Sequence, residues 1–522
     1  MRKFNVTGRC VPEEDYMVDI SSKLEQIIRL IDRRYYFTIN RARQYGKTTT
    51  LFSLTKALAS DYTCINLSFE GVGETMFKSP ASFCQRFLLH VSKALENIDK
   101  DFAAAWPNES MIDFDLLGFH LDKMCRDRKI VLLIDEVDKT SNNQVFLHFL
   151  GMLRSKYLSR GNGYSFTFHS VILAGVYDIK NIKQKIMSEG KYKPASEEGK
   201  IYNSPWNIAV DFDVDMSFSA IEISSMLTEY EADHSTGMDI NAISEEIYRY
   251  TSGYPFLVSR ICQRIDEKLN KDWTPGGIQE AIKIILSEKS TLFDDLIKNI
   301  KNNEKLADFL YDLLFIGAGK DFNIDNSLIN LGYMYGFFQD SDGKVKVANR
   351  IFEIRIYNFF ISEHGPDHDK KRTNGLLKHE VIKNGKFDME LALRKFAEHY
   401  REIFSERNQE FIENNLRLIF LTYLKPLINR QGFYHTESQL IDLRRMDIVV
   451  DYGCDQFIIE LKIWHGGSMH QEAYEQLLGY MDSKNASTGY LLTFDFRQEA
   501  NKQRRTEWVD FEGGKCIFDV VL

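Results

Sequence analysis

The chain of 522 residues is poor in proline, has no low-complexity stretch and carries no excess of positive charge. Only nine prolines and a hydrophobic content of 44% exclude a disordered chain or a collagen-like repeat. No apolar run approaches the roughly 18 residues that cross a membrane, and the N-terminus lacks the apolar core of a signal peptide. The sequence therefore predicts a soluble cytoplasmic protein without a membrane segment.

Cysteine is also scarce. The seven cysteines are odd in number, scattered along the chain and never spaced as Cys-x-x-Cys, at positions 10, 64, 84, 125, 262, 454 and 516. This pattern predicts reduced, mostly buried thiols and argues against a disulfide scaffold or a structural zinc site.

Acidic residues outnumber basic residues, with 75 Asp and Glu against 66 Lys and Arg and a formal net charge of −9. The balance gives no sign of a chain that binds nucleic acid over its whole surface, although net charge averages over domains with different functions. The length predicts three or four domains, each with enough apolar residues for its own core.

The N-terminal part alternates short apolar runs with longer amphipathic segments. We expect helices at 48–60 and 82–95, and strands at 35–39, 64–67, 129–134 and 170–174. The run after Lys129 is continuously apolar, as in a central parallel strand that is buried on both faces. This alternation predicts a doubly wound α/β domain.

The pattern changes after about residue 216. Helical spacing at 219–230, 242–251 and 254–269 predicts a helical bundle, and the helices, turn (340–343) and strand (344–347) that follow predict a winged helix. The polar, breaker-rich stretch 364–375 predicts a linker before a second α/β unit. The expected boundaries are 1–215 for the α/β core, 216–290 for a helical lid, 291–363 for the winged-helix-like module, 364–395 for the linker and 396–522 for the second α/β unit.

Gly46-Lys47-Thr48 lies where the first expected strand gives way to a helix. Backbone N–H groups at such a turn bind phosphate, the lysine pairs with the β- and γ-phosphate oxygens, and the threonine hydroxyl ligates Mg²⁺. About 90 residues later an apolar strand ends in Asp135-Glu136. There the aspartate would hold Mg²⁺ through water and the glutamate would polarise the attacking water. The alternative is an acidic turn after a buried strand.

These motifs resemble a known group. Residues 41–48 resemble the Arg-rich Walker A variant of AAA-like ATPases of the STAND and archaeal type, although Arg41 replaces the first glycine. Residues 134–139 resemble their Walker B, and Gly253-Tyr254-Pro255 resembles the Gly-x-Pro motif of their helical lid. The resemblance covers about residues 1–360 and implies ATP and Mg²⁺ as cofactors. It implies Glu136 as catalytic residue, Thr48 and Asp135 at the metal, and as nucleotide contacts Arg41, Arg43, Gln44, Gly46, Lys47, Thr48, Thr49 and Asp135.

Several roles in this site stay open. Arg41 and Arg43 contact phosphate or a neighbouring protomer, or they are simply solvated. Arg154 and Arg160 are candidates for an arginine finger that acts on a neighbouring protomer. Tyr16 either stacks on adenine or packs in the core.

A second group of charged residues lies near the C-terminus. Asp447 begins an expected strand, a turn is expected at 451–455, and the next strand, 456–462, carries Glu460 and Lys462 on one face because side chains alternate with period two. A hairpin would bring Asp447 close to Glu460. Two carboxylates and a carbonyl can hold Mg²⁺ or Mn²⁺, and Lys462 can position the water that attacks a phosphodiester.

This spacing resembles the PD-(D/E)XK nuclease superfamily over about residues 396–522. Gln476-Leu-Leu-Gly-Tyr480 resembles the Gln-x-x-x-Tyr motif of its RecB-like branch. The resemblance implies metal binding by Asp447 and Glu460 and catalytic roles for Asp447, Glu460, Lys462, Gln476 and Tyr480. A further acid that often completes such a site is Glu410, Glu413 or Glu437. The alternative is an exposed Glu/Lys face on an edge strand.

Other polar residues nearby have weaker assignments. The Arg444-Arg445 pair suits a phosphate backbone or a surface ion pair, and we interpret the loop with His465 and His470 as a flexible substrate-contacting loop, not as a metal site. Residues 365–522 contain 22 Lys and Arg against 25 Asp and Glu. Affinity for nucleic acid would therefore depend on local patches and on a bound divalent ion.

The predicted fold class is a multidomain α/β protein, with a P-loop ATPase core, helical lid and winged helix before a PD-(D/E)XK-like nuclease. The favoured function is an ATP-driven or ATP-gated nuclease of bacterial defence or mobile elements, with nucleic acid as partner and DNA favoured over RNA. The alternatives are a signalling switch that oligomerises with nucleotide and keeps a non-catalytic nuclease-like domain, and a transposition or recombination ATPase. Homo-oligomerisation stays open.

Overall fold

The computed structural model divides the chain into two compact units. The first comprises Met1–Tyr248, Gly253–Gln263 and Met334–Gly336, and the second comprises Arg249–Ser252, Arg264–Tyr333 and Phe337–Leu522. The structure describes residues 2–106, 113–137, 143–160, 165–176, 206–316, 320–364, 380–403, 409–428, 432–437, 447–464, 466–497 and 504–522.

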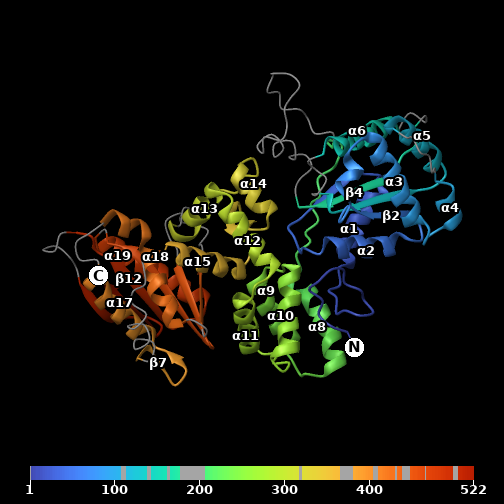
Figure 1. The fold of residues 1–522 in the computed structure, drawn as a ribbon. Helices are drawn as coiled ribbons and strands as arrows, with labels where there is room; N and C mark the ends of the chain where they lie inside the picture. The colour runs from blue at the N-terminus through green and yellow to red at the C-terminus, as the bar shows by residue number, and fades with distance from the viewer. Residues whose placement is uncertain are drawn as a thin grey trace, which may run out of the picture. The chain divides into compact units, whose positions relative to one another are not determined.

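The first unit is built on a parallel sheet in the order β1-β4-β3-β2. Its strands are β1 (Phe37–Asn40), β2 (Thr63–Ser68), β3 (Ile130–Asp135) and β4 (Ser170–Gly175). An isolated parallel bridge between Phe37 and Val210 extends the order beyond β1. Helices cover both faces, as expected of a doubly wound domain (Figure 1). One face carries α1 (Ser21–Asp32) and α2 (Lys47–Leu58), and the other carries η1 (Glu74–Phe77), α3 (Pro80–Leu95), α4 (Lys100–Ala104), α5 (Phe114–Met124) and α6 (Gln144–Ser159).

Strand β3 shows why the sheet is placed as predicted. All six of its residues are buried. Leu132 belongs to the core on the side of Phe83 and Phe149, whereas Leu133 belongs to the core on the side of Leu51. Alternate side chains therefore fill two separate cores, which explains the unbroken apolar run and confirms the central parallel strand.

The helical region after this sheet contains α8 (Ala220–His234), α9 (Ile240–Thr251), α10 (Pro255–Lys268) and α11 (Pro275–Ser287). Helix α8 begins with a capping box between Ser219 and Glu222. The turn between α9 and α10 has left-handed backbone at Ser252 and Gly253, with φ of +45° and +71°. The Phe218 N–H donates to the Gly253 carbonyl at 2.8 Å, so this turn is held against the start of α8.

From Thr291 to His364 the chain forms a run of helices, a hairpin and a further helix, an order typical of a winged helix. The elements are α12 (Thr291–Lys301), α13 (Glu304–Tyr311), the π-helical turn η4 (Asp312–Ile316), α14 (Ser327–Met334), β5 (Phe338–Ser341), β6 (Lys344–Val347) and α15 (Arg350–His364). An isolated antiparallel bridge joins Asp321 to Lys344 of the hairpin.

The rest of the second unit is a mixed sheet in the order β13-β14-β12-β11-β10-β9. Its strands are β9 (Gly432–Glu437), β10 (Asp447–Tyr452), β11 (Asp455–Ile463), β12 (Thr488–Phe494), β13 (Arg505–Phe511) and β14 (Lys515–Val521). Helix α19 (Gly467–Ser483) packs on one face, where Leu477 meets Ile458 and Leu491. Helix α17 (Met389–Ile403) packs Phe396 against Phe494, and α18 (Gln409–Ile428) lies beside α17.

The structure shortens one expected turn and describes only part of the expected linker. The turn predicted at 451–455 is wrong in extent, because β10 continues to Tyr452 and β11 begins at Asp455, which leaves Asp451 inside a strand. Within 364–395, the described residues form the short hairpin β7 (Ile382–Lys383) and β8 (Lys386–Phe387) and the start of α17. The predicted linker stretch after His364 lies outside the described residues.

All seven cysteines are free, and Cys64, Cys84, Cys125 and Cys262 are buried. Burial raises the pKa of the Cys64, Cys84 and Cys125 thiols to about 12, so these side chains behave as small apolar groups. The helices in the described part of the chain include none that is long and apolar enough to cross a membrane.

The turn before α10 generates a stability prediction. A Cβ on Gly253 would lie 1.9 Å from the Phe218 carbonyl oxygen, in a backbone conformation with positive φ. We therefore expect Gly253→Ala to lower the free energy of unfolding by at least about 2 kcal/mol, measured by denaturant titration. Gly151 lies in helix α6 with open space around its Cα, so Gly151→Ala is the matched control and should be neutral or stabilise by about 1 kcal/mol. Equal losses in the two variants would contradict this account of the turn.

Candidate functional site

The loop between β1 and α2 has the geometry of a phosphate cradle. Gln44 and Gly46 both have left-handed backbone, with φ of +57° and +78°. Lys47 is buried, and its Nζ donates to the carbonyls of Arg41 and Ala42 at 2.8 Å each. The loop thus wraps around an ammonium group at the start of α2, which is where a phosphate would gain both backbone N–H groups and a positive charge.

A direct hydrogen bond joins this loop to the acidic end of β3. The Thr48 hydroxyl donates to Asp135 Oδ2 at 2.6 Å, and Asp135 Oδ1 accepts from the Glu136 N–H at 2.9 Å. Asp135 is buried, and Glu136 has an uncommon left-handed φ of +57°. A hydroxyl and a carboxylate in contact are the oxygen donors that suit Mg²⁺, so these residues fit the ion that the resemblance implies.

The arginines of the loop and the core have defined positions. Arg41 donates to the carbonyls of Asn40 and Val214 at 2.8 Å each, so its guanidinium is held on backbone oxygens. Arg43 is exposed. Of the finger candidates, Arg154 donates to Asn207, and Arg160 donates to the Arg34 carbonyl and lies 3.7 Å over the Tyr157 ring.

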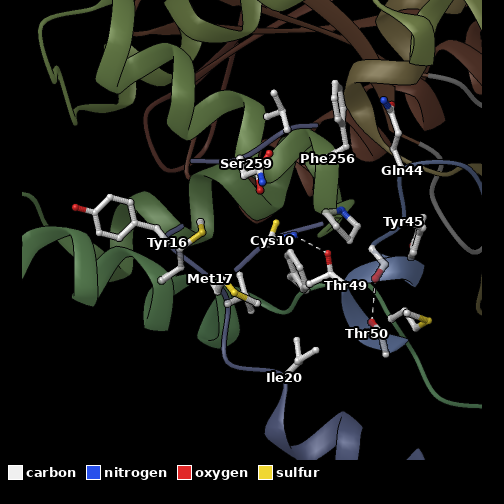
Figure 2. Close-up of a pocket in the computed structure, with 18 of the residues that line it drawn as sticks. Cys10, Tyr16, Met17, Ile20, Gln44, Tyr45, Thr49, Thr50, Phe256 and Ser259 are labelled. Atoms are coloured by element: carbon white, nitrogen blue, oxygen red, sulfur yellow. Dashed lines mark hydrogen bonds between the residues drawn. The ribbon is translucent and has the colours of Figure 1, made fainter. Parts of the chain in front are cut away.

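Beside the cradle lies a cavity of about 350 Å³, a size that suits a small-molecule ligand. Figure 2 shows Gln44 and Tyr45 of the loop and Thr49 of α2 on one side of it and Phe256 and Ser259 of α10 on another. The N-terminal arm adds residues 5–8 and Cys10, whose N–H donates to Thr49 Oγ1 at 3.2 Å. Sequence reasoning missed the arm residues and Phe256, because a lining drawn from distant segments has no local spacing.

Tyr16 lines the cavity, but its ring is buried in an aromatic cluster. The ring centroids of Phe4 and Tyr230 lie 5.0 and 5.1 Å away. Its hydroxyl donates to Asp233 at 2.9 Å, which lowers the pKa of that carboxyl, and in Figure 2 it points away from the other labelled side chains. These contacts favour the packing alternative over stacking on a base.

The Gly253-Tyr254-Pro255 segment contacts the loop directly. The Tyr254 hydroxyl donates to the Arg43 carbonyl at 2.5 Å, and its ring meets Tyr45 edge-on at 4.7 Å. Pro255 lies against Gly46 and lines the cavity. This motif therefore packs directly against the loop between β1 and α2.

In the second unit, the backbone brings the predicted acids to one row of the sheet. Asp447 of β10 is the Cα partner of Glu437 of β9. On its other side β10 pairs with β11 in the register Ile448 to Ile459, so the next residues in line are Asp447 and Glu460. The structure describes the backbone of Glu437 and Asp447, and likewise that of Glu410 and Glu413 in α18, but not their side chains.

Glu460 and Lys462 are not on an edge strand, which removes that alternative. Strand β11 lies between β10 and β12. Glu460 is only 2% exposed and forms an ion pair with Lys462. Arg417 of α18 is also buried close enough to interact electrostatically with Glu460, and burial lowers the pKa of this guanidinium.

Helix α19 packs on β11 and β12 and carries the Gln-x-x-x-Tyr residues. Tyr480 is buried in the core under this helix, and Gln476 Oε1 is buried without a hydrogen-bond partner among the described residues. The interpretation of His470 as part of a flexible loop is wrong, because helix α19 already begins at Gly467. His470 is buried, and its Nε2 lies 3.0 Å from Asp519 Oδ2. His465, Arg444 and Arg445 lie outside the described residues.

Among side chains that the structure describes, no group of three or more His, Cys, Asp and Glu residues could hold a metal ion. This finding does not test the acids where β9 ends and β10 begins, because the side chains of Glu437 and Asp447 are not among those that the structure describes.

The cradle yields a prediction about nucleotide binding and turnover. Lys47→Ala removes the ammonium group that would pair with a bound phosphate, so nucleotide affinity should fall by about tenfold or more. Glu136→Gln should keep the affinity but lower the rate of ATP hydrolysis by about 100-fold or more, because an amide is no general base. Equilibrium binding of a fluorescent nucleotide and phosphate release measure the two effects. Lys56→Ala, on the exposed side of α2, is the control and should match wild type.

Comparisons with known proteins match two parts of the chain to known families. Residues 18–353 match the family of the AAA-like domain, and residues 432–506 match the PD-(D/E)XK nuclease superfamily. No curated protein matches the chain significantly.

Several solved structures resemble the chain at 10% sequence identity. The Walker-type ATPase PABY2304 of Pyrococcus abyssi has a TM-score of 0.46 and covers 68% of this chain and 99% of its own. The ORC2 protein of Aeropyrum pernix has a TM-score of 0.36 in its ADPNP–ADP complexes, with 69% and 97% coverage, and 0.36 in its ADP form, with 70% and 98%. At these scores the assignment depends on the family matches alone. The chain therefore belongs to the family of the AAA-like ATPase domain, and it carries a C-terminal domain of the PD-(D/E)XK nuclease superfamily.

Proposed function

We propose that the chain binds and hydrolyses ATP and that its nucleotide state gates a metal-dependent nuclease. The substrate is nucleic acid, with DNA favoured over RNA, and the reaction is hydrolysis of a phosphodiester bond. A setting in defence or mobile-element biology rests on analogy of fold alone.

The observation that carries the nuclease proposal is the ion pair between the buried Glu460 carboxylate and the partly exposed Lys462 in a central strand. Burial of a carboxylate costs desolvation energy that its attraction to one partner seldom repays, so such a pair contributes little to stability. A domain that only bound a partner would not need it. An acid and a lysine beside further acids on neighbouring strands are what a hydrolytic metal site requires.

Asp447 and Glu460 are the residues that would hold Mg²⁺ or Mn²⁺, since the register that pairs Ile448 with Ile459 makes them the next residues in line on β10 and β11. When bound, the ion supplies positive charge to the phosphate and lowers the pKa of its water. Lys462 would orient the attacking water from the same strand. Residues 365–522 contain more acidic than basic residues, 25 against 22, so in this proposal the positive charge that binds phosphate comes largely from the ion.

ATP hydrolysis in this proposal uses the residues of the cradle. Lys47 and the loop amides hold the phosphates, Thr48 and Asp135 hold Mg²⁺, and Glu136 orients the water. The contact of Thr48 with Asp135 at 2.6 Å supports this division of roles.

The nuclease roles predict separable activities. Glu460→Ala and Lys462→Ala should each lower the rate of cleavage by about 100-fold or more while ATP hydrolysis stays at the wild-type rate, because the two sites use different residues. Cleavage of labelled single- and double-stranded DNA and RNA, with Mg²⁺ or Mn²⁺ and with or without ATP, measures the first rate. Glu472→Ala, exposed on α19, is the control. A wild-type protein that never cuts under any of these conditions would refute the proposal.

The register also ranks the three candidates for the further acid. Glu437 is the Cα partner of Asp447, so we expect Glu437→Gln to lower the cleavage rate by about tenfold or more, and Glu410→Gln and Glu413→Gln by less. The metal dependence separates a ligand from a structural residue, because loss of a ligand raises the Mn²⁺ concentration needed for half-maximal cleavage. If a variant on α18 shows the larger shift instead, the further acid comes from that helix.

A further inference from the structure

Two tyrosines, four residues apart, flank the turn between α9 and α10 and bond to different segments of the chain: Tyr250 lies in the last turn of α9, and Tyr254 directly precedes α10. Tyr254 donates to the Arg43 carbonyl of the phosphate loop at 2.5 Å. Tyr250 donates to Asp451 Oδ2, on strand β10 of the nuclease domain, at 3.2 Å. We propose that this turn couples the nucleotide loop to β10, with Tyr250 and Asp451 as positioning residues for the nuclease site.

On the nucleotide side of the turn, Tyr254 and Pro255 contact the loop between β1 and α2. Tyr254 contacts Arg43 and Tyr45, and Pro255 lies against Gly46. Phosphates bind such a loop through its backbone N–H groups. A nucleotide therefore acts on the same backbone segment that Tyr254 and Pro255 contact.

The turn itself is held in one conformation. Ser252 and Gly253 both have positive φ, and the Gly253 carbonyl accepts from the Phe218 N–H. Any side chain at Gly253 would overlap the Phe218 backbone. A turn so constrained transmits a shift of Tyr254 to Tyr250 instead of absorbing it.

The second end is a buried polar cluster. Tyr250 is fully buried and Asp451 is 4% exposed. Asp451 Oδ1 accepts from Gln456 Nε2 at 2.6 Å, and Arg350 Nη1 lies 4.0 Å from Oδ2. The Arg350 and Arg249 guanidinium groups lie 5.4 and 5.0 Å from the centre of the Tyr250 ring. In a dry environment these interactions depend strongly on position, so a displaced Tyr250 displaces Asp451.

Strand β10 joins this cluster to the nuclease site. Asp451 lies four residues after Asp447 on the same strand, and β10 is paired on both sides, with β9 and β11. A strand held in register on both sides moves as a unit, so the position of Asp451 sets that of Asp447. The coupling rests on the proposed function, because it assumes that nucleotide fills the loop and that Asp447 serves the nuclease.

Hydrogen exchange of the full-length protein tests the coupling without any need for cleavage. A slowly hydrolysed ATP analogue with Mg²⁺ should slow exchange of the amides at 447–452 by about fivefold or more in the wild type. Tyr250→Phe removes only the hydroxyl, so it should keep the nucleotide affinity and lose this slowing. No slowing in the wild type, or the same slowing in Tyr250→Phe, would overturn the inference.

Cleavage supplies the second readout. For a coupled site we expect the analogue to change the wild-type cleavage rate by about 5- to 150-fold, and this ratio should fall to within about twofold of unity in Tyr250→Phe. Tyr248→Phe is the matched control, since Tyr248 is exposed on the same helix, and it should respond like the wild type. A wild type that does not cut refutes the proposed nuclease function, whereas exchange still decides the coupling.

Asp451→Asn separates positioning from simple folding. The amide oxygen of Asn can still accept from Tyr250, so Asp451→Asn should keep part of the effect of nucleotide on exchange and cleavage. Asp451→Ala should abolish that effect. A response in Asp451→Ala equal to that in Asp451→Asn would contradict a role for this hydrogen bond.

Discussion

The hydrogen bond from the Thr48 hydroxyl to the Asp135 carboxylate joins the loop after β1 to the end of β3, the two halves of the candidate nucleotide site. It exists because β1 and β3 are parallel strands of one sheet, so the segments that follow them emerge at the same edge. The apolar residues of β3 keep that strand in the core as far as Asp135, which then lies at the boundary with the loop. Lys47 precedes Thr48 at this junction, and Tyr254 and Pro255 contact the same loop at Arg43 and Gly46.

Much of the first unit could be predicted from the sequence because its signals are local. The apolar run of β3 and the glycine before Lys47 each act over a few residues, and both are found where the pattern places them. The cavity lining could not be predicted, since its arm residues and Phe256 are more than 200 positions apart. Tyr16 shows the same limit, because its partners on α8 determine its role and no spacing reveals them.

In the second unit, Asp451 shows how tertiary contacts override local composition. The segment Asp451-Tyr-Gly-Cys-Asp455 has the composition of a turn, yet Asp451 continues strand β10 and is buried. Its carboxylate is satisfied by Gln456, across the hairpin, and by Tyr250, which is 201 positions away in sequence. The loop predicted around His470 is wrong for a similar reason. Helix α19 begins at the second of the two glycines before it, and the buried ring of His470 then lies within hydrogen-bond distance of Asp519.

The buried charges of the second unit specify geometry more than stability. Glu460 with Lys462, Asp451 with Arg350, and Asp519 with Arg505 all have a carboxylate that is at most 4% exposed. Apolar residues of similar size would fill those places at lower desolvation cost. Their placement is informative because two of the three carboxylates lie on β10 and β11, and β10 also carries Asp447. A strand pair held by directional bonds to charged groups can take up only a few positions, and a site that must align two carboxylates around one ion needs such a limit.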